Sequence, residues 1–460
     1  MTAGRGRARA VAQKSRQVAP ARAAAFEVLR RVEEESAFAS VLLAHMTAEL
    51  SQQDRSLCYE LTLGVLRWQL WLDAALGHFA GRGAATLDAP VRRALRLGLY
   101  QLRFLTRVPA SAAVNESVNL AHAHGMRAAA GLVNAVLRRA TREPDFDPAS
   151  LARDELERVA VATSHPAWLV ARWAAEFGAA EADQIARANN RTPPVAFRVN
   201  ERREGSRDVI ARLRGAGVRV EESEIARGAW RVVAGTGGEM LRALASDGII
   251  YTQDEASQLV GQVVGARAGE SVLDVCAAPG SKATQLAAQT EGLAVVVACD
   301  VYEHRLRTVV ESARRQSVEN VLTVALDAEG AALPFADGSF DRVLVDAPCT
   351  GTGTLRHNPE IRWRITPADV VDLSARQRRI LAGSARAVRP GGRLVYSTCS
   401  LEREENEAVV ESFLAAHPEF RQTRADAPED LLTTAGAART FPHRDDADGF
   451  FVAVLERGDE

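Results

Sequence analysis

From about Gly248 to the end of the chain, short apolar runs rich in β-branched residues alternate with stretches of helical periodicity. The runs are SVLDVC (271–276), AVVVACD (294–300), VLTVALD (321–327), FDRVLVD (340–346) and RLVYSTC (393–399). Apolar strands that alternate with helices are typical of a parallel, doubly wound sheet. We therefore predict an α/β Rossmann-like domain here, closed by a last strand within GFFVAVLE (449–456).

The front of the chain follows a different pattern. Residues 21–145 show helical periodicity throughout, which predicts an all-α N-terminal domain. Pro90 suits the first turn of one helix, in which one face is apolar. A second face of that helix carries four arginines, Arg92, Arg96, Arg103 and Arg107. This predicted basic ridge indicates either an RNA-binding face or an ordinary solvated face.

The net charge of −2 hides an uneven distribution. Residues 1–142 carry 20 Arg and Lys against 10 acids, whereas the remaining residues carry 37 against 49. A basic front half predicts a polyanionic partner, although a solvated helical face explains the charge equally well. Residues 1–20 lack apolar periodicity, and we predict a disordered basic arm that contacts phosphates.

Cysteine usage and hydropathy exclude several classes of protein. The five cysteines are scattered, with no CxxC, which argues for reduced thiols and against a disulfide framework or a metal site. No apolar run approaches the length of a membrane span, and the basic N-terminus lacks the apolar core of a signal peptide. We therefore expect a cytoplasmic protein without a membrane partner.

Four segments follow from these patterns. We predict the basic arm at 1–20, the helical domain at 21–145, a helical linker with a small α/β module at 146–235, and the Rossmann-like domain at 236–460. The module contains the runs VAFRVN, VRVEE and WRVVAG around one helix. We expect it to be too short for a core of its own.

Acidic residues end successive strands of the predicted sheet, namely Asp274, Asp300, Asp327 and Asp346. Ligands of open α/β sheets bind beyond these strand ends. The first turn, CAAPGSK (276–282), allows a close approach of backbone to ligand at Pro279-Gly280, and Asp300 lies where a carboxylate accepts from ribose hydroxyls. Since no P-loop is present, S-adenosylmethionine fits better than a triphosphate. The alternative for each acid is a helix N-cap.

Two of the predicted strands end near cysteines: Cys349 in DAPCTGTG follows the run that ends at Asp346, and Cys399 in VYSTCS ends the next run. Methylation of cytosine C5 requires a thiolate that attacks C6, a carboxyl near N3 and N4, and a group that assists elimination. Cys399, Asp346 and Cys349 offer that set, and Lys282 can supply the positive potential that activates a thiolate. The alternative is two inert buried thiols. Cys58 and Cys299 are expected to be core residues.

Six motifs occur in order: CAAPGSK, DAPCTGTG, HNPEIRW, VYSTCS, EENE and DGFF. As a set they resemble the Fmu/Sun family of bacterial 16S ribosomal RNA cytosine-C5 methyltransferases, and the helical front resembles the NusB-like RNA-binding domain of that family. Ser281 and Thr350 depart from the residues common in the family, but both remain small.

The resemblance implies an S-adenosylmethionine site, a nucleophile and a second thiol. The cofactor site would comprise Cys276, Ala277, Ala278, Pro279, Gly280, Ser281, Lys282, Asp300, Asp327 and Asp346. Cys399 would be the nucleophile and Cys349 the thiol that assists base release. The roles reverse if the Pro-Cys motif acts as it does in DNA cytosine-C5 methyltransferases. The implied partner is 16S ribosomal RNA rather than DNA, and we expect a monomer.

Two other functions remain open on the residues alone. An amino-methyltransferase would use the same cofactor site, but it normally carries an aromatic residue after the proline of a D-P-P-Y motif, which is absent here. A pure RNA-binding module would need only the helical domain.

Overall fold

The computed structural model describes residues 18–235, 237–330 and 333–459. Most of the predicted basic arm lies outside the described residues. The chain divides into two compact units. The helical unit comprises residues 1–191 together with 355–364, and the sheet unit comprises residues 192–354 and 365–460. Among the described residues, no helix is both long and apolar enough to cross a membrane.

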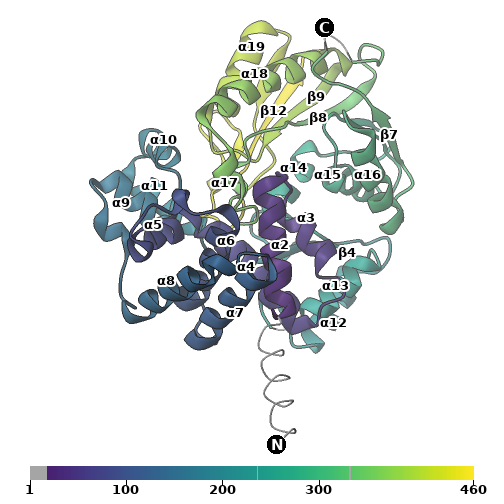
Figure 1. Cartoon of the computed structure of the whole chain (residues 1–460). Helices are drawn as coiled ribbons and strands as arrows, with labels where there is room; N and C mark the ends of the chain where they lie inside the picture. The colour runs from purple at the N-terminus through teal and green to yellow at the C-terminus, as the bar shows by residue number, and fades with distance from the viewer. Residues whose placement is uncertain (1–17, 236, 331–332, 460) are drawn as a thin grey trace, which may run out of the picture. The chain divides into compact units, whose positions relative to one another are not determined.

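Every regular element described in the helical unit is a helix (Figure 1). The α-helices are α2 (Pro20–Glu34), α3 (Ala39–Met46), α4 (Gln52–Arg67), α5 (Gln69–Ala80), α6 (Ala89–Phe104), α7 (Ala110–Ala123), α8 (Ala130–Arg142), α9 (Glu155–Thr163), α10 (Ala167–Phe177), α11 (Ala179–Ala188) and α17 (Ile361–Arg364). Local sequence sets several starts: Pro20 and Pro90 occupy first-turn positions, and the Ser51 side chain accepts from Asp54 N. The apolar faces of α2 to α8 bury one common core, which includes Phe26, Cys58 and Leu95.

The predicted basic ridge on α6 is wrong, because three of the four arginines are paired within the unit and the fourth lies outside the helix. Arg92 pairs with Glu33, and the guanidinium of Arg96, which is 7% exposed, pairs with Asp73. Arg103 donates to the carbonyl oxygens of Ala140, Glu143 and Pro144. Arg107 lies beyond the end of α6. These guanidinium groups therefore hold helices together instead of forming an open polar face.

The segment 355–364, which the sequence places between two parts of the sheet unit, belongs to the helical unit. Arg362 is fully buried, and its two terminal nitrogens donate to five oxygens. The acceptors are the carbonyls of Arg67 (3.3 Å), Ser164 (3.1 Å), Asn189 (3.3 Å) and Leu355 (3.3 Å) and the side-chain oxygen of Asn190 (3.0 Å). One guanidinium thus ties together four stretches of chain.

The sheet unit begins with a small antiparallel sheet of order β2-β3-β1-β4. Its elements are β1 (Val195–Val199), α12 (Ser206–Gly215), β2 (Arg219–Glu222), β3 (Ala229–Ala234), α13 (Gly238–Ser246) and β4 (Ile250–Thr252). Phe197, Val209 and Leu213 pack with Leu241 and Ile250, so that the later residues of α13 and β4 complete the core. The residues up to 235 do not form this core alone, in line with the expectation that they are too few for a core of their own.

The large sheet has the order β10-β12-β9-β8-β5-β6-β7, with β11 paired to β12. Its strands are β5 (Ser271–Asp274), β6 (Val295–Asp300), β7 (Val321–Ala325), β8 (Phe340–Asp346), β9 (Val388–Thr398), β10 (Phe420–Thr423), β11 (Ala438–Arg439) and β12 (Phe451–Arg457). The pairs from β9 to β7 are parallel, whereas β12 runs antiparallel to β9 and β10. The predicted α/β fold is confirmed, as a mixed rather than a wholly parallel sheet.

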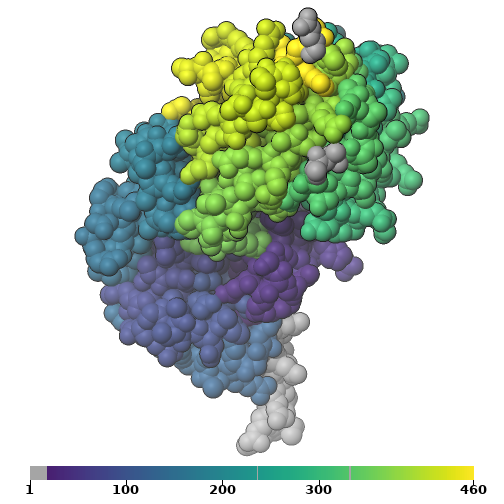
Figure 2. All heavy atoms as spheres, turned by 90° about the horizontal axis from the view of Figure 1, so that it is seen from above, coloured from purple at the N-terminus to yellow at the C-terminus, as the bar shows by residue number. Residues whose placement is uncertain are grey.

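Helices cover both faces of this sheet (Figure 1). They are α14 (Glu255–Val264), α15 (Ser281–Gln289), α16 (Glu303–Arg315), α18 (Pro367–Ser384) and α19 (Glu407–Ala416). Successive residues of β8 point to opposite sides: Leu344 packs in the core of α14, α15 and α16, whereas Val343 and Val345 pack in the core of α18 and α19. In the space-filling view, the green and yellow residues of the sheet unit's C-terminal half form one continuous body (Figure 2).

Candidate active site

The turn after β5 carries the predicted cofactor residues from Cys276 to Lys282. Ala277 N donates to Cys299 O in β6, and Gly280 N donates to Ala277 O, both at 2.7 Å, so hydrogen bonds fix the turn. Gly280 has a φ of 100°, and a Cβ atom there would lie 3.0 Å from Val309. The backbone conformation and the limited space together favour glycine at this position.

Lys282 lies in the first turn of α15 and is 7% exposed. Its Nζ is 2.7 Å from Asp346 Oδ2, at the end of β8, and 5.2 Å from the centroid of the Phe450 ring. Asp346 Oδ1 accepts a hydrogen bond from Ser397 Oγ at 2.7 Å. Burial alone would lower the pKa of Lys282, but Asp346 raises it above its ordinary value. The ammonium group therefore keeps its charge.

The two predicted thiols meet. Cys349 follows the end of β8, Cys399 follows the end of β9, and their Sγ atoms are 3.4 Å apart. Both residues are partly exposed. The hydrogen bond with Cys399, together with burial, raises the pKa of the Cys349 thiol well above its ordinary value. Cys349 therefore favours the protonated form beside the Cys399 sulfur.

A buried carboxylate holds both thiol-bearing loops. Glu405 is fully buried, and Oε1 accepts from Thr350 N (2.9 Å) and Gln377 Nε2 (2.9 Å), while Oε2 accepts from Thr350 Oγ1 (2.5 Å) and Ser400 Oγ (2.5 Å). Thr350 is the neighbour of Cys349 and Ser400 is the neighbour of Cys399. One side chain thus fixes the positions of both loops relative to each other.

Two glycines bring a third loop against the thiols. Gly353 N donates to Cys399 O at 2.9 Å, and Gly449 N donates to Gly353 O at 2.8 Å. A Cβ atom on Gly353 would lie 1.9 Å from Gly449 O, and one on Gly449 would lie 2.5 Å from the Leu401 side chain. The absence of side chains therefore lets the DGFF loop approach, and this loop carries the Phe450 ring beside Lys282.

The remaining strand-end acids have different surroundings. Asp274 is 1% exposed, and both of its carboxylate oxygens lack a hydrogen-bond partner among the described residues. Burial, and next the charge of Asp346, raise the pKa of Asp274 to about 7. Asp300 accepts from Tyr302 N and pairs with Arg305, whereas Asp327 is exposed and accepts from Glu329 N in its own loop.

The structure brings together Lys282, Asp346, Cys349 and Cys399, as the strand-end pattern predicts. Cys58 and Cys299 are fully buried core residues, as expected, and burial raises the pKa of the Cys58 thiol to about 11 and that of Cys299 to about 12. The sequence patterns predict no role for Ser397, Glu405 or Phe450. Strand alternation was an available signal for Ser397, since it lies two residues before Cys399.

Comparison with known proteins places this arrangement in a family. Three family models match the chain: the 16S rRNA methyltransferase RsmB/F at residues 262–456, the NusB family at 19–142, and the RsmF/B-like ferredoxin-like domain at 165–236. The probable ribosomal RNA small subunit methyltransferase B of Bacillus subtilis is 34% identical over 94% of this chain and 98% of its own length.

The chain belongs to the RsmB/F family of ribosomal RNA methyltransferases.

Other members and structures agree with this assignment. The ribosomal RNA small subunit methyltransferase B of Pseudomonas putida is 36% identical over 88% of this chain and 91% of its own length. The crystal structure of PH0851 superposes with a TM-score of 0.82 at 28% identity, over 96% of this chain and 99% of that chain. A methyltransferase homologue from Pyrococcus horikoshii gives a TM-score of 0.58 at 27% identity, over 66% of this chain and 100% of that one. This RsmB/F member is thus an S-adenosylmethionine-dependent methyltransferase with a NusB-like helical domain.

Proposed function

We propose that this chain transfers a methyl group from S-adenosylmethionine to C5 of a specific cytosine in 16S ribosomal RNA. Cys399 attacks C6 of the base, and Cys349 assists elimination and release. The observation that carries the proposal is the 3.4 Å separation of the two Sγ atoms at the ends of neighbouring parallel strands. The relatives named as small-subunit ribosomal RNA methyltransferases support the choice of RNA.

The chemistry explains why two thiols are useful. Bond formation between Cys399 Sγ and C6 moves the C5–C6 π electrons toward C5, which then accepts the methyl group. S-adenosylmethionine supplies this electrophilic methyl when it is bound. Loss of the C5 proton restores the double bond and expels the Cys399 sulfur. Cys349 gives its proton to the departing sulfur and takes up the proton from C5, so that the proton count of the pair balances.

The electrostatics support Cys399 as the nucleophile. The raised pKa of Cys349 keeps a proton on that thiol, which can then donate toward the Cys399 sulfur. Lys282 keeps its charge and supplies positive potential to the site. Asp346, held between Lys282 and Ser397, is the carboxyl that we assign to N3 and N4 of the base.

The strand ends suit the cofactor that the family uses. We assign its site to Cys276–Lys282, Asp300, Asp327 and Asp346. Asp300, 5% exposed at the end of β6, is where a carboxylate accepts from ribose hydroxyls in α/β folds.

We assign 1–20 to a basic arm, 21–145 to the RNA-binding helical domain, 146–235 to a linker and accessory RNA-binding module, and 236–460 to the methyltransferase domain. The protein acts as a cytoplasmic monomer on ribosomal RNA and not on DNA.

A double-label assay tests the function. Unmodified 16S ribosomal RNA is transcribed with tritium at C5 of cytosine and incubated with S-adenosylmethionine that carries a ¹⁴C-methyl group. We expect one tritium released for each methyl gained, because C5 exchanges its hydrogen for the methyl group. Methyl transfer without tritium release would instead indicate an exocyclic amine, and no transfer would indicate a binding module.

A further inference from the structure

The two thiols of the candidate active site lie within reach of a covalent bond with each other. Cys349 and Cys399 are both free and partly exposed, and their Sγ atoms are 3.4 Å apart. Because a disulfide bond is about 2.0 Å long, the two sulfurs have to approach by only about 1.4 Å. Rotation about the Cα–Cβ bonds of the two side chains supplies a movement of this size. Only a local movement therefore separates the two thiols from a disulfide.

The backbone around the pair holds the two sulfurs side by side. Ala347 N, directly after β8, donates to Ser397 O in β9 at 2.9 Å, and Gly353 N donates to Cys399 O at 2.9 Å. Glu405 accepts hydrogen bonds from both thiol-bearing loops. A thiol held in this way meets its neighbour at a far higher effective concentration than it meets a thiol in solution. Once one sulfur is oxidised, the other is thus the nucleophile best placed to react with it.

The two thiols are suited to different steps of an oxidation. Peroxides attack thiolates, and the cysteines that they oxidise reversibly are often placed next to a second, resolving thiol. Cys399 is the sulfur that the proposed function uses as a thiolate, so we expect it to be the site of attack. The hydrogen bond with Cys399, together with burial, raises the pKa of the Cys349 thiol, which therefore keeps its proton and acts as the resolving thiol.

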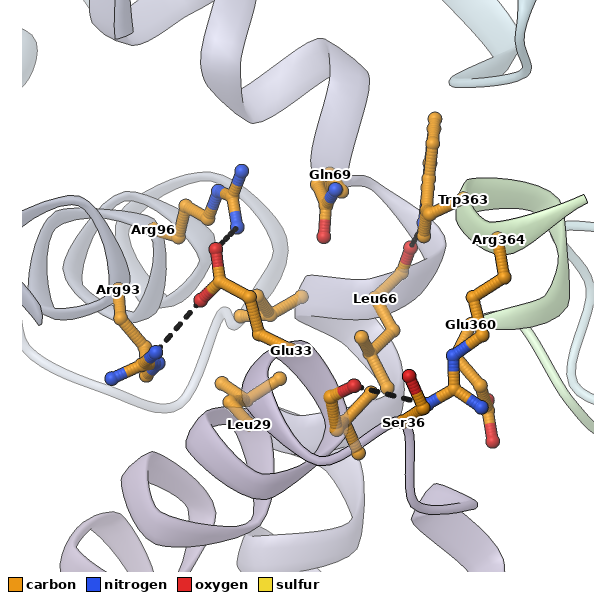
Figure 3. Close-up of a pocket in the computed structure, with 12 residues that line it drawn as sticks. Leu29, Glu33, Ser36, Leu66, Gln69, Arg93, Arg96, Glu360, Trp363 and Arg364 are labelled. Carbon is orange, nitrogen blue, oxygen red and sulfur yellow. Dashed lines mark hydrogen bonds and ion pairs between the residues drawn. The ribbon is translucent and has the colours of Figure 1, made fainter. Parts of the chain in front are cut away.

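The other three cysteines are poorly placed for this reaction. Cys58 and Cys299 are fully buried. Cys276 is partly exposed, but burial and the charge of Asp274 raise the pKa of its thiol well above the ordinary value. In the helical unit, the pocket shown in Figure 3 has no cysteine among the described residues that line it, so a small oxidant that enters it meets no thiol. A reversible oxidation should therefore be confined to the thiol pair of the active site.

We propose that a peroxide converts Cys349 and Cys399 into a reversible disulfide, which switches methyl transfer off. Cys399 Sγ, as a thiolate, takes one oxygen atom from hydrogen peroxide, forms a sulfenic acid and releases hydroxide, which takes up the proton that Cys399 lost on ionisation. Cys349 Sγ then bonds to Cys399 Sγ and displaces the hydroxyl group, which leaves as water with the proton of Cys349. Overall, the two thiols are oxidised by two electrons, and one peroxide is reduced to two molecules of water.

The disulfide blocks both roles that the sulfurs have in methyl transfer. Cys399 in a disulfide is no longer a thiolate that can bond to C6, and Cys349 no longer carries a proton to exchange. A dithiol reductant restores both thiols by exchange. The inference rests on the proposed function for the loss of methyl transfer, whereas formation of the disulfide does not depend on it.

Oxidation of the full-length chain with hydrogen peroxide tests the pair. We expect peptide mass spectrometry to find Cys349 joined to Cys399, in a chain that is lighter by two hydrogens. Transfer of a ¹⁴C-methyl group to unmodified 16S ribosomal RNA should fall in proportion to the fraction of chains that carry the disulfide, and dithiothreitol should restore it. Calorimetric binding of S-adenosylmethionine should be retained, because neither thiol belongs to the turn 276–282, and this binding shows that the oxidised chain remains folded.

One variant and a matched control separate the roles of the cysteines. Cys349→Ser removes the resolving sulfur and keeps a side chain of similar shape. The sulfenic acid of Cys399 should then be oxidised further to a sulfinic acid, which dithiothreitol does not reduce. Cys299→Ala is the control, because it removes a fully buried thiol and leaves the pair intact. It should form the disulfide as the wild type does.

The outcomes separate this inference from the proposed function. Further oxidation of Cys399 in the wild type without a link to Cys349, or a link from either thiol to Cys276, would overturn the switch. Methyl transfer that continues in fully linked protein would overturn the switch together with the role of the thiols in the proposed function. A disulfide that forms in a protein whose reduced form methylates no cytosine would refute only the proposed function.

Discussion

At the scale of single residues, the site combines groups whose charge states depend on one another. Lys282 keeps its charge because of Asp346, and Cys349 keeps its proton because of Cys399. Burial and Asp346 hold Asp274 partly protonated near neutral pH. The thiol pair can be tested by trapping a covalent adduct, and Asp274 by the change of stability with pH.

The division of labour between the thiols is tested by trapping. RNA that contains 5-fluorocytosine cannot lose its C5 substituent, so the covalent adduct accumulates when the nucleophile is present. We expect Cys399→Ala to form no adduct on a denaturing gel. Cys349→Ala should remain bound to methylated natural RNA, because release is impaired. An adduct that survives in Cys399→Ala and is lost in Cys349→Ala would reverse the two roles.

The raised pKa of Asp274 gives a pH dependence of stability. A carboxyl whose pKa is raised on folding favours the folded state below its unfolded pKa of about 4, and this contribution is lost as pH rises toward 7. Asp274→Asn removes the penalty for ionisation. The free energy of unfolding of the variant, relative to the wild type, should therefore improve by roughly 2–3 kcal/mol from pH 5 to pH 8. Urea unfolding at both pH values measures it.

A control for this titration lies at another strand end. Asp327 is exposed, so Asp327→Asn should show no comparable change between the two pH values. If Asp274→Asn and the wild type lose stability in parallel as the pH rises, Asp274 is ionised throughout that range and the raised pKa is wrong.

At the scale of elements, the two thiols lie just beyond the ends of β8 and β9, and the short turn before α19 holds the loops that carry them. Glu405 lies in a short 3-10 turn (Arg403–Glu405) before α19 and accepts hydrogen bonds from the neighbours of both cysteines. The register of the strands brings the two chain segments side by side, with Asp346 opposite Ser397. The hydrogen bonds to Glu405 then fix the loops beyond the strand ends.

Removal of the Glu405 carboxylate should loosen both loops. Glu405→Ala removes the acceptor of Thr350 N and one acceptor each of the Thr350, Gln377 and Ser400 side chains, which should lower the free energy of unfolding by about 2–4 kcal/mol. Adduct formation should slow while the affinity for S-adenosylmethionine is retained. Calorimetric binding and rapid-quench kinetics measure these two effects. Glu411→Ala, which removes an exposed pair with Arg403, is the control and should cost less than about 0.5 kcal/mol.

Strand pattern alone was enough to predict the sheet and the convergence of the thiols, because residues at the carboxyl ends of parallel strands meet at one edge. It could not predict which acidic side chains and carbonyl oxygens would pair with the arginines of α6. Arg93 meets Glu33 across 60 residues of chain, and that pairing depends on helix packing. The pattern did not show that Leu241 and Ile250, assigned to the next domain, complete the core of the small module.

At the scale of the whole molecule, the segment 355–364 makes the helical unit discontinuous in sequence. The segment begins directly after Thr354, a few residues beyond the thiol Cys349. It places Arg362 among the carbonyls of the helical unit. The stability of the helical unit should therefore depend on this one guanidinium.

Arg362→Lys tests that dependence. A single ammonium cannot reach all the carbonyls that a guanidinium fork reaches, so we expect a loss of about 3 kcal/mol in the stability of the helical unit. Hydrogen exchange should become faster at the ends of α4, α9 and α11, which supply three of the acceptor carbonyls. Arg376→Lys, at an exposed pair with Glu329, is the control. Unchanged protection in these helices would contradict the expectation.

The discontinuity also sets a delay during synthesis. The ribosome must add the 163 residues between Arg191 and Leu355 before the last piece of the helical unit emerges. At about 5–20 residues per second, this takes roughly 10–30 s. Throughout that interval the nascent helices lack Arg362. The carbonyls of Arg67, Ser164 and Asn189 can therefore be hydrated or bound by a chaperone until β8, Cys349 and the segment 355–364 have all been translated.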